Sequence, residues 1–371
     1  MNAAQALLLT ALGLASASAQ GGSFVYFGTY TGRQSKGIYV SRFDAGKLSE
    51  PVLAGELSNP SFLAVHPNGR VLYAVSEMRE GTVAAFAIDP ATGQLAKIGE
   101  RSSGGSGPCY LSVDHSGRVL MVANYNSGTL EALALDKNGN FGDGTFTVAH
   151  HGSSVNPQRQ RGPHAHSIDP SPDNRFAIAD DLGMDKVMVY RLNTEKPALE
   201  PNEPPAFDVK PGSGPRHFAF APNGKFAYVI SELASTVTAL AWDGERGKLT
   251  EVQTVSTLPE DFQGQSTAAE IAVHPSGKFV YGSNRGHDSI AVFAVDGAKG
   301  TLKPVERVPS GGSVPRGFAV DPSGRWLIAA NQQSNNAVLF RIDKKTGKLT
   351  PSGTTLAIGS PVSVLLVAAG K

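Results

Sequence analysis

The sequence has little of several features that would identify a class of protein. Its single cysteine, Cys109, excludes an intrachain disulfide framework and any metal site made of several cysteines. The formal net charge of the 371 residues is only +1, so the composition gives no reason to expect nucleic acid or an anionic membrane surface as a partner. Long helical patterns are hard to find. After the N-terminal region, no apolar run approaches the roughly 20 residues that span a bilayer, and we expect no membrane span.

Turn-forming residues, in contrast, are abundant. The 42 glycines and 24 prolines make up about 18% of the chain, above a background of roughly 12%. Hydrophobic residues account for 40% of the sequence, which is ample for a large core. The length alone suggests one to three domains.

The N-terminal region has the pattern of a secretory signal peptide. Residues 6–14 form an apolar run, and Ala17-Ser18-Ala19 is a small-x-small cleavage site. The pattern predicts a signal peptide over residues 1–19, cleaved after Ala19, and a mature single domain over residues 20–371 in the periplasm or the medium. The segment before the apolar run contains no Lys or Arg. A disordered or helical tail is therefore the alternative.

A repeat of about 50 residues organises the rest of the chain. Residues 60–73, 215–228 and 315–328 share a proline, a short apolar segment, a Pro-Ser/Asn-Gly turn and a second apolar segment. The predicted copies begin at Pro60, Pro108, Pro163, Pro215, Ala268, Pro315 and Pro361. A period of this length with four short strands per copy is typical of a propeller blade.

The two ends of the chain are complementary halves of one copy. Only one strand follows Pro361, whereas residues 24–30 and 37–43 resemble a second and a third strand. We therefore predict an all-β, seven-bladed β-propeller whose last blade is closed by the N-terminal strands. Such closure leaves no free strand edge between the first and last blades. An open array or two sandwiches would be the alternative.

The repeat also predicts where polar side chains meet. Residues one and seventeen positions after each start should surround one mouth of the central channel. The first set is Ser61, Cys109, His164, Arg216, Ala269, Arg316 and Val362, and the second is Glu77, Tyr125, Asp180, Glu232, Arg285 and Gln332, with Tyr30 closing the ring. A few convergent polar groups in a mostly apolar fold are typical of a small-molecule site.

These residues resemble the seven-bladed propeller lactonase family, which includes the bacterial propeller-type 6-phosphogluconolactonase and fungal carboxymuconate cyclases. The motifs that carry the resemblance are Tyr26-Phe-Gly-Thr-Tyr30-Thr, Gly162-Pro-His-Ala-His166, Gly214-Pro-Arg-His217, Ser231-Glu-Leu and Ser283-Asn-Arg285-Gly. The resemblance covers nearly the whole mature chain. In the cyclase branch it implies catalytic roles for His164, Glu232, Arg216 and Arg285. The predicted export is a departure, because a pentose phosphate enzyme works in the cytoplasm.

Several roles remain open for these residues. His164 or Glu232 is the candidate base, and Arg285 a candidate oxyanion stabiliser. Arginines favour bidentate contact with carboxylate or phosphate, but the same groups also form structural ion pairs. The predicted substrate-binding residues are Arg216, His166, Arg316, Glu77, Tyr30 and Asp180. Asn124, Asp180, Glu232 and Asn331 could offer oxygen ligands to calcium in the channel, but no calcium loop motif is present. We predict neither a metal nor a cofactor.

The preferred hypothesis is a hydrolase that opens a sugar-type lactone with base-activated water. No Gly-x-Ser-x-Gly elbow supplies a serine nucleophile, which favours direct attack by water. One alternative is a muconate-type lactonizing cycloisomerase, in which arginines hold carboxylates. Another is a propeller that binds a ligand or protein without catalysis. The expected partner is a small lactone or organic acid, with no nucleic acid, and we expect a monomer.

Overall fold

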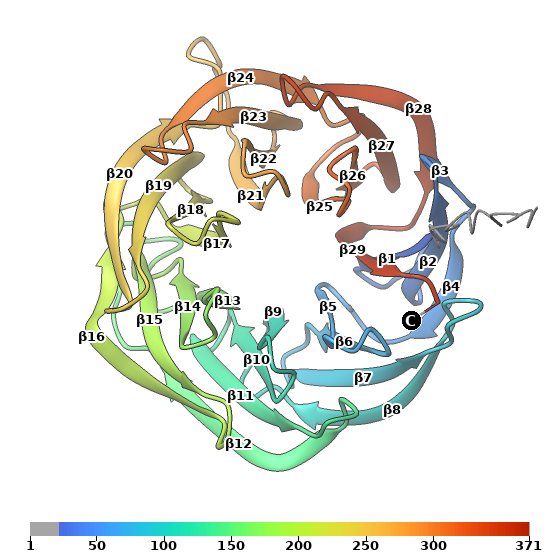
Figure 1. Ribbon diagram of the computed structural model, residues 1–371, viewed down its shortest axis with the longest axis horizontal. Coiled ribbons are helices and arrows are strands. Elements are labelled where there is room, and N and C mark those ends of the chain that lie inside the picture. The colour runs from blue at the N-terminus through green and yellow to red at the C-terminus, as the bar shows by residue number, and fades with distance from the viewer. Residues whose placement is uncertain (1–21, 371) are drawn as a thin grey trace, which may run out of the picture.

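Seven antiparallel sheets surround a central axis in this computed structural model, which describes residues 22–370 (Figure 1). Each sheet is one blade, with its first strand beside the axis and its last strand at the rim. Residues 22–370 contain no helix, and so none that could cross a membrane. The predicted all-β, seven-bladed propeller is confirmed.

Six blades are continuous in the sequence and run in order from the axis to the rim. Three of them consist of β5 (Leu63–Val65), β6 (Val71–Ser76), β7 (Thr82–Ile88) and β8 (Leu95–Ser102); β9 (Pro108–Val113), β10 (Val119–Asn124), β11 (Thr129–Leu135) and β12 (Phe141–Ala149); β13 (Ala165–Pro170), β14 (Phe176–Asp181), β15 (Lys186–Asn193) and β16 (Ala198–Asp208). The next three consist of β17 (Pro215–Phe220), β18 (Phe226–Ser231), β19 (Thr236–Asp243) and β20 (Lys248–Ser256); β21 (Thr267–Val273), β22 (Phe279–Arg285), β23 (Ser289–Val295) and β24 (Leu302–Pro309); β25 (Pro315–Val320), β26 (Trp326–Asn331), β27 (Asn336–Ile342) and β28 (Leu349–Ala357).

The seventh blade combines both ends of the chain, as predicted. Its innermost strand is β29 (Pro361–Ala368), which pairs with β1 (Ser23–Thr29) in antiparallel register from Ser23 opposite Ala368 to Thr29 opposite Pro361. Next comes β2 (Gly37–Asp44), which pairs with both β3 (Lys47–Leu48) and β4 (Val52–Glu56). The C-terminal strand therefore closes the ring (Figure 1).

The turn after each first strand explains one difference from the predicted register. In five blades this turn holds a glycine with φ between 65° and 72°, at Gly69, Gly117, Gly224, Gly277 and Gly324. In the blade that begins with β13 (the β13 blade), Asn174 takes this position with φ 62°. Asparagine is among the few residues other than glycine that tolerate this region. In this blade the strand that corresponds to the other first strands begins at Ala165, and the repeat predicted its start two residues earlier, at Pro163.

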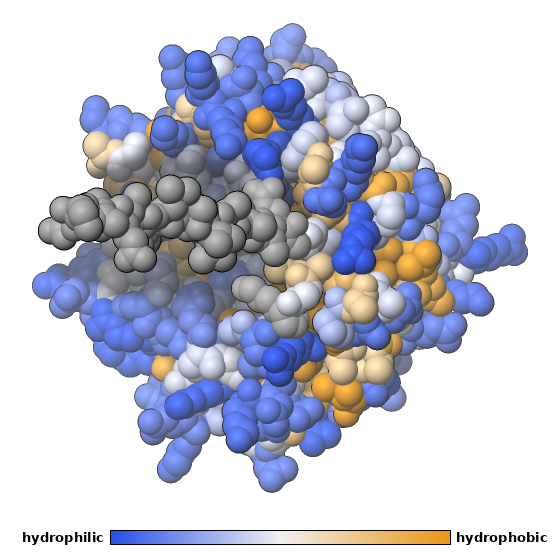
Figure 2. All heavy atoms as spheres, turned by 45° about the vertical axis from the view of Figure 1, so that its right-hand side comes forward, coloured by the Kyte–Doolittle hydropathy of each residue, from blue (hydrophilic) through white to orange (hydrophobic). Residues whose placement is uncertain are grey.

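Burial is greatest in the second strands of the blades and least in the fourth strands at the rim. Second strands such as β10 and β18 are buried at every residue, because each has a strand on either side and a neighbouring blade on both faces. Two buried tyrosines donate their hydroxyl hydrogen bonds to a neighbouring blade: Tyr73 to the carbonyl of Gly139 at 2.5 Å, and Tyr281 to that of Gly347 at 3.0 Å. The face shown in Figure 2 is largely hydrophilic, with hydrophobic residues in small groups.

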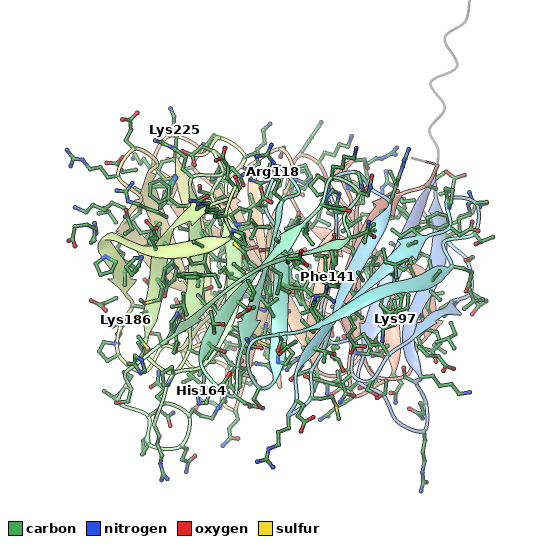
Figure 3. All side chains as sticks on the ribbon, turned by 90° about the horizontal axis from the view of Figure 1, so that it is seen from below. Lys97, Arg118, Phe141, His164, Lys186 and Lys225 are labelled. Carbon is green, nitrogen blue, oxygen red and sulfur yellow. The ribbon has the colours of Figure 1, made fainter. Side chains whose placement is uncertain are left out.

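Different segments of the blades lie at the two ends of the channel. The turns after the first strands, which include Arg118 and Lys225, lie at one end, and His164 lies at the other (Figure 3). We call this second end the mouth. There the residue after a second strand donates its backbone N–H to the residue before the first strand, as in Glu232 N to Gly214 O at 2.7 Å. This repeated bond brings side chains of different blades to one level.

Candidate active site

A single carboxylate, that of Glu232, holds three arginines at the mouth. Its Oε1 accepts a hydrogen bond from Arg159 Nη2 at 2.7 Å, and its Oε2 lies 3.1 Å from Arg216 Nε and 2.8 Å from Arg285 Nη2. The side chains of Glu232 and Arg216 are 6% and 2% exposed, whereas that of Arg159 is 38% exposed. The repeat places Arg216 on β17, Glu232 after β18 and Arg285 at the end of β22. The carboxylate therefore gathers guanidinium groups from two blades and a loop.

The arginines decide the charge state of this carboxylate. Burial alone would raise the pKa of Glu232, but the charges of Arg285 and Arg216 and the hydrogen bond from Arg159 outweigh it and lower the pKa to about 2. Burial, together with the neighbouring arginine charges, lowers the pKa of Arg216 to about 10. All four groups are thus charged near neutral pH. A carboxylate with so low a pKa is a weak base, so this geometry favours Glu232 as an orienter of arginines.

Replacing this carboxylate should destabilise the protein. We expect Glu232→Gln to lower the free energy of unfolding at pH 7 by roughly 3–5 kcal/mol, because it leaves buried guanidinium groups without their counter-charge. The pKa of Glu232 is depressed in the folded state, so its contribution is complete above its ordinary value of 4.5 and is lost as the pH falls towards about 2. Urea unfolding should show a large difference from the parent at pH 7 and a much smaller one at pH 3. Exposed Glu245→Gln is the control; equal stability of both variants would contradict the expectation.

His164 has a fixed tautomer and one free nitrogen. Its Nδ1 lies 2.9 Å from the backbone oxygen of Tyr125, and a carbonyl can only accept, so Nδ1 carries the proton. The Nε2 lone pair has no hydrogen-bond partner among residues 22–370. The imidazole stacks on the Tyr125 ring, with centroids 4.4 Å apart and an angle of 14° between the planes. Asp181 fixes the backbone by accepting the N–H of His164 at 2.8 Å. In the neutral imidazole, Nε2 is therefore the nitrogen that can accept a proton.

Tyr30, Glu77 and Arg316 form a second group at the mouth. The Tyr30 hydroxyl donates to Glu77 Oε2 at 2.9 Å, and the Arg316 guanidinium lies over the Tyr30 ring, 5.4 Å from its centroid. Within the described part of the chain, the Arg316 guanidinium makes no hydrogen bond and no ion pair. Its charge is therefore available to a ligand.

His166 and His217 lie in a buried layer beneath the arginines. The two rings are 5.1 Å apart and each residue is 3% exposed. His217 Nδ1 donates to Glu270 Oε1 at 2.9 Å, and its Nε2 accepts from Arg216 Nη1 at 3.1 Å. Burial lowers the pKa of His217 to about 4 and that of His166 well below its ordinary value. Both rings are neutral, and His166 occupies the position in its blade that Arg216 occupies in the next.

The prediction that Asp180 lies at the mouth is wrong. Its side chain is fully buried one level below, where Oδ2 accepts a hydrogen bond from Ser167 Oγ at 3.0 Å. Leu182 takes the predicted place, since its N–H makes the repeated bond at the mouth, to His164 O at 3.0 Å. The two-residue shift of the β13 blade causes the difference. Among residues 22–370, no three His, Cys, Asp or Glu side chains are grouped as metal ligands.

Arg159 and the His217–Glu270 pair belong to the site although the sequence pattern did not predict them. Arg159 lies in the segment between β12 and β13, outside the repeated pattern. Its position in the blade therefore could not be predicted from the spacing of the repeat. The signals available were the longest interval between repeat starts, from Pro108 to Pro163, and the basic run Arg159-Gln-Arg161 within it. With Arg159 included, four guanidinium groups face the carboxylates of Glu232 and Glu77. The mouth is thus a positively charged site that suits an anion or a developing oxyanion.

The sequence of residues 24–366 matches the family described as Lactonase, 7-bladed beta-propeller. The chain belongs to this family. The 6-phosphogluconolactonase of Bacillus subtilis is 40% identical over 296 residues, covering 79% of this chain and 83% of that protein. The 6-phosphogluconolactonase of Formosa agariphila is 36% identical over 307 residues, with coverage of 79% and 85%. Among solved structures, the periplasmic gluconolactonase of Pseudomonas aeruginosa is 36% identical, with a TM-score of 0.88 and coverage of 94% and 99%.

Membership of the lactonase family agrees with the resemblance seen in the motifs. The family match spans all seven blades, so every side chain described at the mouth from the repeated strands lies inside it. Arg159 and His164 fall within the matched region as well, although they precede the first residue of β13.

Proposed function

We propose that the protein is a lactone hydrolase that opens a sugar-type lactone at the mouth of the propeller. The observation that carries the proposal is the His164 imidazole, whose Nδ1–H is bound by Tyr125 O and whose Nε2 has no partner in the described part of the chain. A neutral imidazole with an open nitrogen is suited to take a proton from water near neutral pH. Membership of the lactonase family and the names of its relatives support the same class of reaction.

In the proposed mechanism, His164 Nε2 removes a proton from a water molecule as the water oxygen attacks the ring ester carbonyl. The carbonyl oxygen gains negative charge, which Arg285 stabilises. Its Nε suits this role, because it is a buried donor with no partner in the part of the chain that the structure describes. The bond from the carbonyl carbon to the ring oxygen then breaks, and protonated His164 returns the proton to the leaving alkoxide. The product is the open hydroxy acid.

The remaining mouth residues are proposed to bind the substrate. Arg316 and Arg216 would attract an anionic group or the polar face of the sugar, while the Tyr30–Glu77 pair would bind hydroxyl groups. His166 would support the site from below, because it is nearly fully buried. The surplus of arginines over carboxylates also suits a diacid. A lactonizing cycloisomerase is therefore the second candidate function.

A panel of lactones tests the proposal. We expect the purified protein to release acid from glucono-δ-lactone, from its 6-phosphorylated form or from both, measured by pH-stat against spontaneous hydrolysis. Comparison of the two sugars reports whether the arginines select a phosphate. A muconate-type diacid, followed by the loss of its ultraviolet absorbance, tests the second candidate. If every lactone opened only at its spontaneous rate, the hydrolase proposal would be wrong.

We further propose that the protein is exported. The predicted signal peptide lies in residues 1–19, outside the described residues, and its apolar run with Ala17-Ser-Ala19 supports export. The relative from Pseudomonas aeruginosa is a periplasmic protein. N-terminal sequencing of the protein from its native host should give Gln20 as the first residue. A retained Met1 or Asn2 on a cytosolic protein would contradict export and favour the phosphorylated substrate.

A further inference from the structure

The segment between β12 and β13, residues 150–164, reaches the mouth through Arg159 and is held by hydrogen bonds to the connection after β14. Gln160 is fully buried and donates from Nε2 to the carbonyl of Leu182 at 2.9 Å. Ser154 Oγ donates to Asp185 Oδ2 at 2.6 Å, and the same carboxylate accepts the backbone N–H groups of Gly212 and Gly214. The segment is therefore fixed to the strand connections on which the site stands.

Arg159 is carried by this fixed segment and reaches two partners at once. Its Nη2 donates to the Tyr125 hydroxyl at 3.0 Å and to Glu232 Oε1 at 2.7 Å. Arg216 and Arg285 already neutralise Glu232 from the buried side, so a third and more exposed partner adds little to stability. What Arg159 alone adds is a link from Glu232 to Tyr125.

Tyr125 in turn determines how the imidazole of His164 lies. Its ring stacks on the His164 ring, and its backbone oxygen accepts the Nδ1–H at 2.9 Å. A tyrosine held only by its own stacking would be free to turn about its side-chain bonds. The bond from Arg159 fixes the far end of the ring. The chain of contacts therefore runs from Glu232 through Arg159 and Tyr125 to the imidazole of His164.

We propose that Arg159 is a positioning residue for the proposed hydrolysis: it clamps Tyr125 to Glu232 and so holds His164 in the orientation of a base. This inference rests on the proposed function, in which His164 accepts the proton of water. Arg159 acts through Tyr125 and not on the substrate. The effect of removing it should therefore appear in kcat more than in KM, because a small misplacement of a reacting group is costly.

The test compares Arg159→Ala and Arg159→Lys with Arg161→Ala. Arg161 is exposed, lies in the same segment and, among residues 22–370, its side chain bonds only the carbonyl of Pro157, so its removal should leave activity unchanged. We expect Arg159→Ala to lower kcat on the order of 10²-fold with KM nearly unchanged. Lysine cannot reproduce the planar donor group, so Arg159→Lys should recover only part of the rate. Added guanidinium ion should restore activity to the alanine variant. A higher KM with an intact kcat would overturn the proposal.

A second variant identifies the path of the effect. Tyr125→Phe keeps the ring on which His164 stacks but removes the hydroxyl that Arg159 binds. If the clamp works through this hydroxyl, the double variant should be no slower than either single variant. Full activity of Tyr125→Phe beside a slow Arg159→Ala would overturn the proposal.

Failure of the hydrolase proposal would be recognised separately, since the parent protein itself would open no lactone. The clamp would then be judged from crystal structures of Arg159→Ala and the parent. A shifted Tyr125 ring and a broken bond from His164 Nδ1 to Tyr125 O would support it. An unchanged pair would overturn it.

Discussion

His164→Ala should lower kcat for the best lactone by roughly 10²–10⁴-fold, the range over which general acid–base catalysis contributes. The loss is large because one nitrogen serves twice, removing a proton from water and later protonating the leaving alkoxide. Glu232, His166 and His217 are poorly suited to replace it: the pKa of Glu232 is about 2 and that of His217 about 4, and burial lowers the pKa of His166 well below its ordinary value. Initial rates by pH-stat on parent and variant, at saturating substrate, measure the effect.

The control for this variant is His151→Ala. His151 is exposed in the same segment and lies outside the proposed machinery, so its removal should leave kcat unchanged. Melting temperatures of both variants separate loss of chemistry from loss of fold. The assignment of the base fails if His164→Ala hydrolyses as fast as the parent. A lower melting temperature with full activity per folded molecule would instead mean that His164 is a structural residue.

The parts of the fold that could be predicted are those specified by local chemistry repeated along the chain. A positive-φ glycine after a short apolar segment recurs at Gly69, Gly224 and Gly324, and the spacing around it sets the strand pairing. Because the pattern is periodic, the convergence of Arg216, Glu232 and Arg285 followed from counting alone. The complementary ends of the chain likewise predicted the pairing of β1 with β29, which is confirmed.

The parts that could not be predicted are those outside the period. In the β13 blade, Asn174 replaces the glycine, and an additional proline, Pro170, ends the first strand two residues before the turn proline Pro172. Counting from Pro163 therefore placed Asp180 at the wrong level. Arg159 is on a segment whose path depends on tertiary contacts, chiefly those of the buried Gln160. The sequence also left open whether His164 or Glu232 is the base. The structure favours His164, because the arginines around Glu232 lower the pKa of that carboxyl group to about 2.

Removal of β29 should abolish the folded state. The strand is the innermost of its blade: Val362 and Val367 are 3% and 5% exposed, and all of β1 from Ser23 to Thr29 pairs with it. Burying one such side chain is worth about 1.5–3 kcal/mol, and lost backbone bonds and exposure of the β1 edge add to the cost. The sum is of the order of the whole stability of a domain, about 5–15 kcal/mol. Because each blade packs only on its neighbours, opening the ring exposes both sides of the gap.

A chain that ends at Gly359 tests this expectation against one that ends at Ala369, which retains all of β29. We expect the longer chain to melt cooperatively like the parent, and the shorter one to lack a cooperative transition or to aggregate. A synthetic peptide of residues 360–371, added in trans, should restore folding and lactone turnover to the shorter chain, since it supplies the missing strand. If the shorter chain melts at the parent temperature without the peptide, closure by β29 does not stabilise the propeller.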